Sequence, residues 1–207
     1  MKTMMRCLVI VILVGTISTQ LMGQWVKAGL DNRVYAMAVS GTNIFAGNDS
    51  GVYISPNNGS NWQLVNTGLT NTNISSFAVI GTNIFAGTGR NTMQPHEFRP
   101  GSGVFLSTNN GANWTAVNTG LVSKTISTLA ASPSGNLFAG TDSAGIFLST
   151  NNGTNWNAVN TGLTITHVDV LTATDSIIMA GCGNKVFLSS NNGATWTLVD
   201  TTLGTIS

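Results

Sequence analysis

The stretch Gly103-Val-Phe-Leu-Ser-Thr-Asn-Asn-Gly-Ala-Asn-Trp114 decides the fold, because the chain contains it in four closely similar copies. The other three copies are Gly51-Val-Tyr-Ile-Ser-Pro-Asn-Asn-Gly-Ser-Asn-Trp62, Gly145-Ile-Phe-Leu-Ser-Thr-Asn-Asn-Gly-Thr-Asn-Trp156 and Lys185-Val-Phe-Leu-Ser-Ser-Asn-Asn-Gly-Ala-Thr-Trp196. In each copy a short apolar strand leads into Asn-Asn-Gly, whose residues readily adopt the left-handed conformations of a tight hairpin turn. The repeat therefore predicts four antiparallel hairpins.

The segments on either side extend each hairpin into a larger unit. A second short strand such as Asn83-Ile-Phe-Ala-Gly87 precedes each copy, and each tryptophan leads into Asn-Thr-Gly-Leu or a variant of it. In one unit we expect strands at 75–80, 83–87, 104–107 and 114–118. Successive tryptophans lie roughly 40 residues apart, which is typical of propeller blades. A parallel solenoid is the alternative, and the Asn-Gly hairpins disfavour it.

The sequence thus predicts an all-β fold, a β-propeller of about four four-stranded antiparallel blades. We place the blades at residues 33–67, 73–119, 125–161 and 165–202, within a repeat domain that spans 24–207. We expect an orphan strand at residues 24–29, in which Trp25 begins a partial fifth copy. Three arrangements stay open: a compact ring, an open arc completed by another chain, and part of a larger propeller. An open arc exposes strand edges and apolar faces, which favours self-association.

The repeated motif Ser-x-Asn-x-Gly-x-x-Trp resembles the Asp box, Ser-x-Asp-x-Gly-x-Thr-Trp. This box occurs in sialidases, sortilin-type receptors, xyloglucan-cleaving glycosidases and photosystem II assembly factors. The resemblance covers most of residues 24–203; it implies the fold but no single activity, because unrelated functions share the box. The box positions are Ser55, Asn57, Gly59 and Trp62; Ser107, Asn109, Gly111 and Trp114; Ser149, Asn151, Gly153 and Trp156; and Ser189, Asn191, Gly193 and Trp196.

Asparagine replaces the aspartate of the family in all four boxes. An amide oxygen still accepts backbone N–H bonds, so we expect the hairpin turn to persist without a charge or a cation site. We expect the four tryptophans to pack between blades.

The first 23 residues have the character of a secretion signal. Lys2 and Arg6 precede an apolar run at 7–17, which is shorter than the roughly 20 residues that a membrane span requires. A buried N-terminal strand is the alternative. We therefore expect a secreted, periplasmic or cell-surface protein, bacterial in type, with no integral membrane span after cleavage.

Composition excludes several classes of partner. Charged residues make up only 7% of the chain, and the mature chain is close to neutral, which argues against nucleic acid and anionic lipid as partners. Cys182 is the one cysteine beyond the signal, and it is interpreted as an incidental turn residue. His96 and His167 are interpreted as solitary. We therefore expect no disulfide, metal or cofactor.

One insertion distinguishes the second unit. The segment from Thr88 to Ser102 is much longer than its counterparts and gathers charge in an otherwise neutral chain. A tolerated, solvated surface loop is the plain interpretation, and a binding loop is the functional one. Its ligand-binding candidates are Arg90, His96, Glu97 and Arg99.

Three carboxylates, Asp49, Glu97 and Asp142, fall on equivalent loops of successive units. A pair of them at a suitable separation can hydrolyse a glycosidic bond as acid and base or nucleophile. Asn-Asp-Ser and Thr-Asp-Ser are also ordinary turn sequences. The resemblance to sialidases implies three arginines from separate blades and a tyrosine nucleophile, and the positions of the arginines and tyrosines here do not match that pattern.

These observations favour an exported, non-catalytic propeller that acts as a binding or scaffold module for a protein or polysaccharide. One alternative is a glycoside hydrolase, xyloglucanase-like or sialidase-like, or a truncated relative of one. A second alternative is a protein similar to the photosystem II assembly factors.

Overall fold

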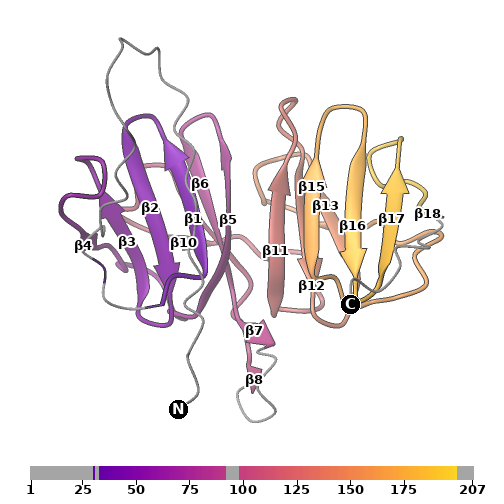
Figure 1. Ribbon diagram of the computed structural model, residues 1–207, viewed down its shortest axis with the longest axis horizontal. Coiled ribbons are helices and arrows are strands. Elements are labelled where there is room, and N and C mark those ends of the chain that lie inside the picture. Colours follow the sequence, from indigo (N-terminus) through magenta and orange to yellow (C-terminus); the bar gives the residue numbers. More distant parts are fainter. Residues whose placement is uncertain (1–29, 31–32, 92–97, 200–207) are drawn as a thin grey trace, which may run out of the picture.

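The computed structural model describes residue 30 and residues 33–91 and 98–199. Every regular element in these residues is a β-strand, and the strands form four four-stranded sheets and one two-stranded sheet (Figure 1). The predicted signal peptide, the orphan strand at 24–29, His96 and Glu97 lie outside the described residues. Within the described ranges, no helix has the length and apolar character needed to cross a membrane.

The four larger sheets are the blades. Blade 1 contains β1 (Ala36–Ser40), β2 (Asn43–Asn48), β3 (Gly51–Ser55) and β4 (Gln63–Leu64). Blade 2 contains β5 (Ile74–Ile80), β6 (Asn83–Thr88), β9 (Val104–Ser107) and β10 (Thr115–Ala116). Blade 3 contains β11 (Ile126–Ala131), β12 (Leu137–Thr141), β13 (Ile146–Ser149) and β14 (Asn157–Ala158). Blade 4 contains β15 (Val170–Ala173), β16 (Ile178–Cys182), β17 (Lys185–Ser189) and β18 (Thr197–Val199).

All strand pairs within the blades are antiparallel, and each blade follows chain order from its inner to its outer strand. The inner strands β1, β5, β11 and β15 contact one another in succession. Figure 1 shows the blades succeeding one another from indigo to yellow without closing a ring. The prediction of an all-β propeller of four antiparallel blades is confirmed, in the form of an open set of blades.

Two details differ from the sequence prediction. The outer strands are shorter than expected: β10 covers Thr115–Ala116, where a strand at 114–118 was predicted. The insertion in blade 2 is a hairpin of β7 (Arg90–Asn91) and β8 (Phe98–Arg99) at its ends. Its hydrophobic pattern is too short to predict a strand pair, so sequence alone indicated only a loop.

The Asn-Asn-Gly turns are held by side chains of the box itself. In blade 3 the Asn151 Oδ1 accepts the backbone N–H of Asn155 at 3.0 Å, and the Ser149 Oγ accepts that of Gly153 at 2.9 Å. Ser149 also donates its hydroxyl proton to the Asn151 Oδ1 at 2.9 Å. The second asparagine of each turn has a φ of 55°, in the left-handed region that asparagine tolerates. An amide oxygen therefore accepts the hydrogen bonds of the turn at the position where the Asp box has a carboxylate.

Each junction between blades rests on the tryptophan that ends the hairpin. The indole Nε1–H of Trp156 donates to the carbonyl of Val117 in the preceding blade at 2.8 Å, and its backbone N–H donates to Thr119 at 2.8 Å. Trp114 and Trp196 repeat both bonds, and all three indoles are buried. Gly120 has a φ of 91°, and a Cβ there would lie 2.2 Å from the Trp156 carbonyl oxygen, so no larger residue fits against that backbone.

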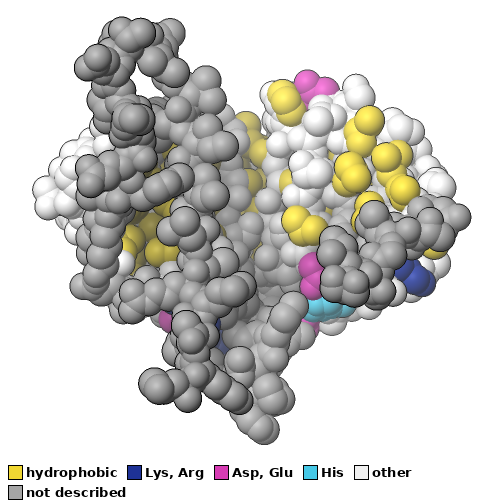
Figure 2. Space-filling model, in the orientation of Figure 1, with side chains coloured by type: hydrophobic (Ala, Val, Ile, Leu, Met, Phe, Trp, Pro, Cys, Tyr) yellow, Lys and Arg dark blue, Asp and Glu magenta, His cyan; other side chains and the backbone are white. Residues whose placement is uncertain are grey.

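The outward face of blade 4 differs from the same face of the other blades. The register places Met179 where blades 1 to 3 carry Phe45, Phe85 and Phe138. Those phenylalanines are fully buried, whereas Met179 is 39% exposed and Val170 is 57% exposed. Figure 2 shows hydrophobic side chains on the half of the molecule that contains β15–β18. An apolar sheet face therefore meets solvent at this end of the described residues.

Replacing Trp156 with Phe tests the junction between blades 2 and 3. The variant loses the indole donor to Val117 and part of a buried ring, so we expect the free energy of unfolding to fall by about 2 kcal/mol. Chemical denaturation followed by circular dichroism measures the loss. Val122→Ala, at a highly exposed position, is the control and should change stability by less than about 0.5 kcal/mol. Equal stability of Trp156→Phe and the wild-type protein would contradict the role of the indole.

Candidate functional site

The residues that could take part in binding or catalysis lie along one edge of the blades. Because the strands are antiparallel, the loops that join the second and third strands of each blade meet the linkers between blades at the same edge. We call this the loop edge; in Figure 1 it is the lower end, where β7 and β8 project. Linkers hold the loops there: Thr72 donates its hydroxyl proton to the Asp49 carbonyl at 2.9 Å, and the Lys124 carbonyl accepts the N–H of Gly103 at 2.8 Å.

In blades 1 to 3 an asparagine after the outer strand fixes these loops. In blade 2 the Asn118 Oδ1 accepts the N–H of Val104 at 2.7 Å, and its Nδ2 donates to the Ser102 carbonyl at 2.9 Å. Asn66 and Asn160 make the same pair of bonds in blades 1 and 3. A Cβ on Gly103 would lie 2.1 Å from the Asn118 side chain, so the glycine is required there. The recurring Asn-Thr-Gly-Leu carries this signal, but its local pattern does not reveal the role of the asparagine.

The base of the β7–β8 hairpin is fixed to the linkers. The Asn71 Nδ2 donates to the Pro100 carbonyl at 2.9 Å, and Gly101 donates its N–H to the Thr125 hydroxyl at 3.2 Å. Arg99, one of the predicted ligand-binding residues, donates from Nη1 to the Asn73 Oδ1 at 3.4 Å. Arg90 lies in β7 with only its backbone described. The hairpin therefore projects from an anchored base.

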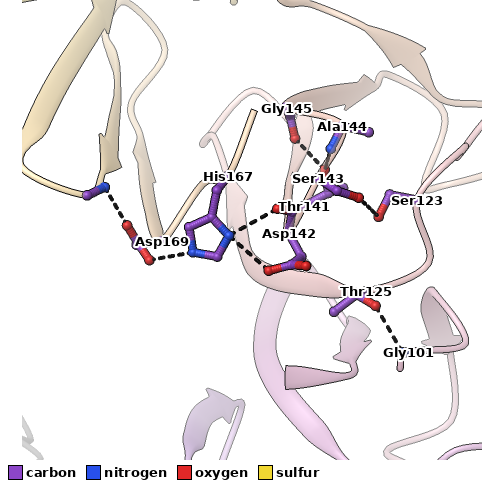
Figure 3. A network of polar contacts seen from close by, with 11 residues as sticks. Gly101, Ser123, Thr125, Thr141, Asp142, Ser143, Ala144, Gly145, His167 and Asp169 are labelled. Atoms are coloured by element: carbon purple, nitrogen blue, oxygen red, sulfur yellow. Dashed lines mark hydrogen bonds and ion pairs between the residues drawn. The ribbon is translucent and has the colours of Figure 1, made fainter. Parts of the chain in front are cut away.

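A second cluster joins blades 3 and 4, and here the sequence interpretation was wrong. His167, treated as solitary, lies between two carboxylates from different loops (Figure 3). Its Nδ1 is 2.9 Å from the Asp142 Oδ1 and 3.0 Å from the Asp142 carbonyl oxygen, and its Nε2 is 2.9 Å from the Asp169 Oδ1. Asp169 in turn accepts the N–H of Gly183 at 2.6 Å through Oδ2. We call Asp142, His167 and Asp169 the imidazole clamp.

The clamp geometry determines the protonation state of the imidazole. A neutral imidazole offers one donor and one acceptor, whereas both ring nitrogens of His167 face oxygens that only accept. Partial burial lowers the pKa of His167, but the bonds to the Asp142 carbonyl and the Asp169 carboxylate, with both negative charges, outweigh it and raise the pKa above 6.5. The clamp therefore favours an imidazolium that bridges two blades, and in that form neither nitrogen can act as a general base.

The three candidate catalytic carboxylates have separate surroundings. Asp142 belongs to the imidazole clamp, and the Asp49 Oδ2 accepts the hydroxyl proton of Tyr35 at 3.1 Å. Glu97 lies outside the described residues. Asp49 and Asp142 do share the loop edge, as the sequence predicted, but each carboxylate already has a partner of its own. Among the described residues, no group of three or more His, Cys, Asp or Glu side chains has an arrangement that could hold a metal ion.

Cys182 also differs from its sequence interpretation as a turn residue. It is the last residue of β16, is fully buried, and packs in the core between blades 3 and 4. Burial, together with the negative charge of Asp169, raises the pKa of its thiol to about 11. The thiol therefore stays protonated at neutral pH, which is the state of an inert core cysteine.

The clamp makes stability depend on pH. Because the folded pKa of His167 is raised, its contribution is fully present below the unfolded pKa near 6.5 and is lost as pH rises through the folded pKa. We expect the free energy of unfolding to fall as pH rises from 6.5 into the alkaline range, and the fall to be smaller in His167→Gln. Urea denaturation across this range measures both slopes. Parallel pH profiles of the two proteins would contradict the clamp.

Comparison with known proteins bears on the fold. No family model and no curated protein matches the chain. Among solved structures, an ancestral GH74 enzyme aligns with a TM-score of 0.63 and 22% identity, over 81% of this chain and 25% of the enzyme. YCF48 bound to D1 peptide aligns with a TM-score of 0.57 and 15% identity, over 82% of this chain and 56% of YCF48.

PorZ, a bacterial surface component of the type-IX secretion system of Porphyromonas gingivalis, also aligns, with a TM-score of 0.57 and 16% identity. The match covers 83% of this chain and 23% of PorZ. This chain therefore spans about a quarter to about half the length of these proteins. All three are β-propellers of the Asp-box type, and at such identities the likeness concerns the fold alone. The chain is an array of four-stranded β-propeller blades.

Proposed function

We propose that this chain is an exported, non-catalytic propeller module that binds a protein or a polysaccharide at its loop edge. The observation that carries the proposal is the β7–β8 hairpin, which interrupts an otherwise regular blade and projects from an anchored base. A solvated loop without a role needs no such anchoring. Projecting loops on a rigid scaffold are where binding residues concentrate, and the candidates Arg90, His96, Glu97 and Arg99 belong to this insertion.

The imidazole clamp favours binding over catalysis. A general acid or base must reach its substrate, whereas Asp142 is engaged by His167 within the protein. The exposed apolar face of blade 4, with Val170 and Met179, is a second surface suited to a scaffold role. The apolar run that follows Lys2 and Arg6, and the likeness to a surface component of a secretion system, both support an exported location.

Two other functions each draw support from one comparison. A glycoside hydrolase acting through Asp49, Glu97 and Asp142 draws support from the likeness to a GH74 enzyme. A role similar to the photosystem II assembly factors draws support from the likeness to YCF48. The near-neutral charge of this chain does not favour the basic surfaces expected of such factors.

A loop exchange tests the role of the hairpin. Thr88 and Gly103 flank the insertion. The Thr88 hydroxyl donates to the Gly103 carbonyl at 2.8 Å, as the Thr141 hydroxyl donates to the Gly145 carbonyl at 2.8 Å in blade 3. Replacing residues 89–102 with the Asp-Ser-Ala of blade 3 should therefore preserve blade 2. We expect retention on immobilised xyloglucan, mixed-linkage β-glucan or a peptide array to fall at least ~tenfold, with the thermal midpoint changed by only a few degrees.

Pro56→Thr is the matched control, because Pro56 is exposed in the turn of the first box, at the opposite edge. It should bind as the wild-type protein does. Unchanged retention in the loop-exchange protein would refute the hairpin as the binding element. Release of reducing ends from either glucan by the purified protein, abolished in Glu97→Gln or Asp142→Asn, would establish the hydrolase instead.

A further inference from the structure

Every junction between blades brings two different sheet faces together. We call the face of a blade that is turned toward the next blade its leading face, and the opposite face its trailing face. At the first junction, Phe45 on the leading face of blade 1 and Phe105 on the trailing face of blade 2 belong to one buried cluster with Trp114. The same positions meet at the next two junctions, as Phe85, Phe147 and Trp156 and as Phe138, Phe187 and Trp196. A leading face is therefore covered, three times over, by the trailing face of another blade.

The residue after the outer strand is part of the same contact. In blade 2 this residue is Val117, whose N–H donates to the Val104 carbonyl at 2.9 Å. The box turn of blade 3 packs against it, since a Cβ on Gly153 would lie 2.8 Å from the Val117 side chain. Val65 and Val159 receive the turns of blades 2 and 4 in the same way, and all three valines are half-buried.

Blade 4 presents a leading face of the same design to solvent. Val199 occupies the position of Val117 but is 39% exposed. Met179, in the phenylalanine position, is also 39% exposed, and Val170 on the same face is 57% exposed. The strand residues of this face carry no charge. Within the described ranges no further sheet follows blade 4, so this leading face lacks the cover that the other three have.

Blade 1 presents the other half of a junction at the opposite end of the array (Figure 1). Leu64 pairs with Tyr53, which stands where blade 2 has Phe105, and Val39 pairs with Ile44 on the same trailing face. Leu64 is 48% exposed and Val39 is 50% exposed. Among the residues that the structure describes, no sheet precedes blade 1. One chain thus carries an exposed leading face at one end and a trailing face with exposed apolar side chains at the other.

We propose that the leading face of blade 4 binds the trailing face of blade 1 in a second copy of this chain. The three internal junctions identify the partner as another blade of this type, and the chain itself supplies one. Val39 and Leu64 of one copy lose contact with water together with Val170, Met179 and Val199 of the other. Burial of these apolar side chains drives the association, and the blade 4 strands place no charge in the contact to oppose it.

The two ends of the chain make the contact reciprocal. When blade 4 of the first copy binds blade 1 of the second, blade 4 of the second copy binds blade 1 of the first, so two copies satisfy both ends. A head-to-tail contact that closes gives a finite ring, here a dimer of eight blades, four from each copy. The contact uses sheet faces rather than the loop edge, so it does not depend on the binding role proposed above.

Sedimentation equilibrium of the purified full chain tests the contact from both sides. We expect a dimer at ~50 µM protein, and we expect Met179→Lys to raise its dissociation constant at least ~tenfold, because each copy then places a lysine charge inside the junction. Leu64→Lys should weaken the dimer to the same extent through blade 1. Both positions are exposed in the single chain, so circular dichroism should show folded variants. Val170→Lys gives the blade 4 result if Met179→Lys does not fold.

Leu198→Lys is the matched control. Leu198 precedes Val199 in β18 and is 47% exposed, but it pairs with Phe187 on the trailing face of blade 4, which is turned toward blade 3 of its own chain. This variant should dimerise as the wild-type protein does. Equal weakening in Leu198→Lys would overturn the proposal, because added charge anywhere on the blade would then explain the loss.

Three other results would overturn the assignment. The first is a wild-type protein that stays monomeric up to ~200 µM. The second is a dimer that neither Met179→Lys nor Val170→Lys weakens. The third is a dimer that Met179→Lys weakens but Leu64→Lys and Val39→Lys leave intact, which would mean that two blade 4 faces meet each other and that blade 1 is not the partner.

Discussion

The fold depends on one repeated interaction, the two hydrogen bonds that each of Trp114, Trp156 and Trp196 donates to the blade before it. The indole and backbone N–H groups of Trp114, Trp156 and Trp196 meet carbonyls of the preceding outer strand and linker. An isolated four-stranded sheet with such short outer strands has little core of its own, so the buried area lies between blades. The box turn matters because it delivers the tryptophan to that junction at a fixed orientation.

This construction divides the residues into a constant frame and a variable edge. The frame consists of the box, the tryptophan and, in blades 1 to 3, the asparagine that fixes the loop. The variable part is the loop edge. The blades differ there at one equivalent buried position, which holds Asn48, Thr88, Thr141 and Cys182 in chain order. Blade 2 adds a hairpin at this edge, and blade 3 supplies Asp142 to the imidazole clamp. Chemistry can change at the loop edge without disturbing the junctions.

The sequence predicted the frame because its signals are local and repeated. The turn of each box and its strands lie within about a dozen residues. The four copies also reveal the spacing between successive blades. The imidazole clamp was missed because His167 meets Asp142 across 25 residues and two blades, and no local pattern encodes that approach. The buried amide nitrogen of Asn48, which has no partner among the residues that the structure describes, was also missed, since Asn-Asp-Ser is an ordinary turn sequence.

Blade 4 shows how departures from the repeat become interpretable only with the structure. Lys185 stands where the other blades have a glycine, and Asp200 stands where they have the loop-fixing asparagine. In blades 1 to 3 a Cβ on that glycine would meet the asparagine side chain at 2.1 to 2.4 Å. The two positions are therefore coupled, and the sequence changes them together. The exposed Met179 in the same blade replaces a buried phenylalanine, so blade 4 departs from the repeat at its outward face as well.

The most direct test of the account is native-state hydrogen exchange at the indole nitrogens. If the indoles hold the blades together, the Nε1 protons of Trp114, Trp156 and Trp196 should exchange only through unfolding of the blades, with protection comparable to the most protected strand amides. Exchange of these three protons at the rate of free tryptophan in an otherwise folded protein would contradict the account, because the blades would then be held together by something else.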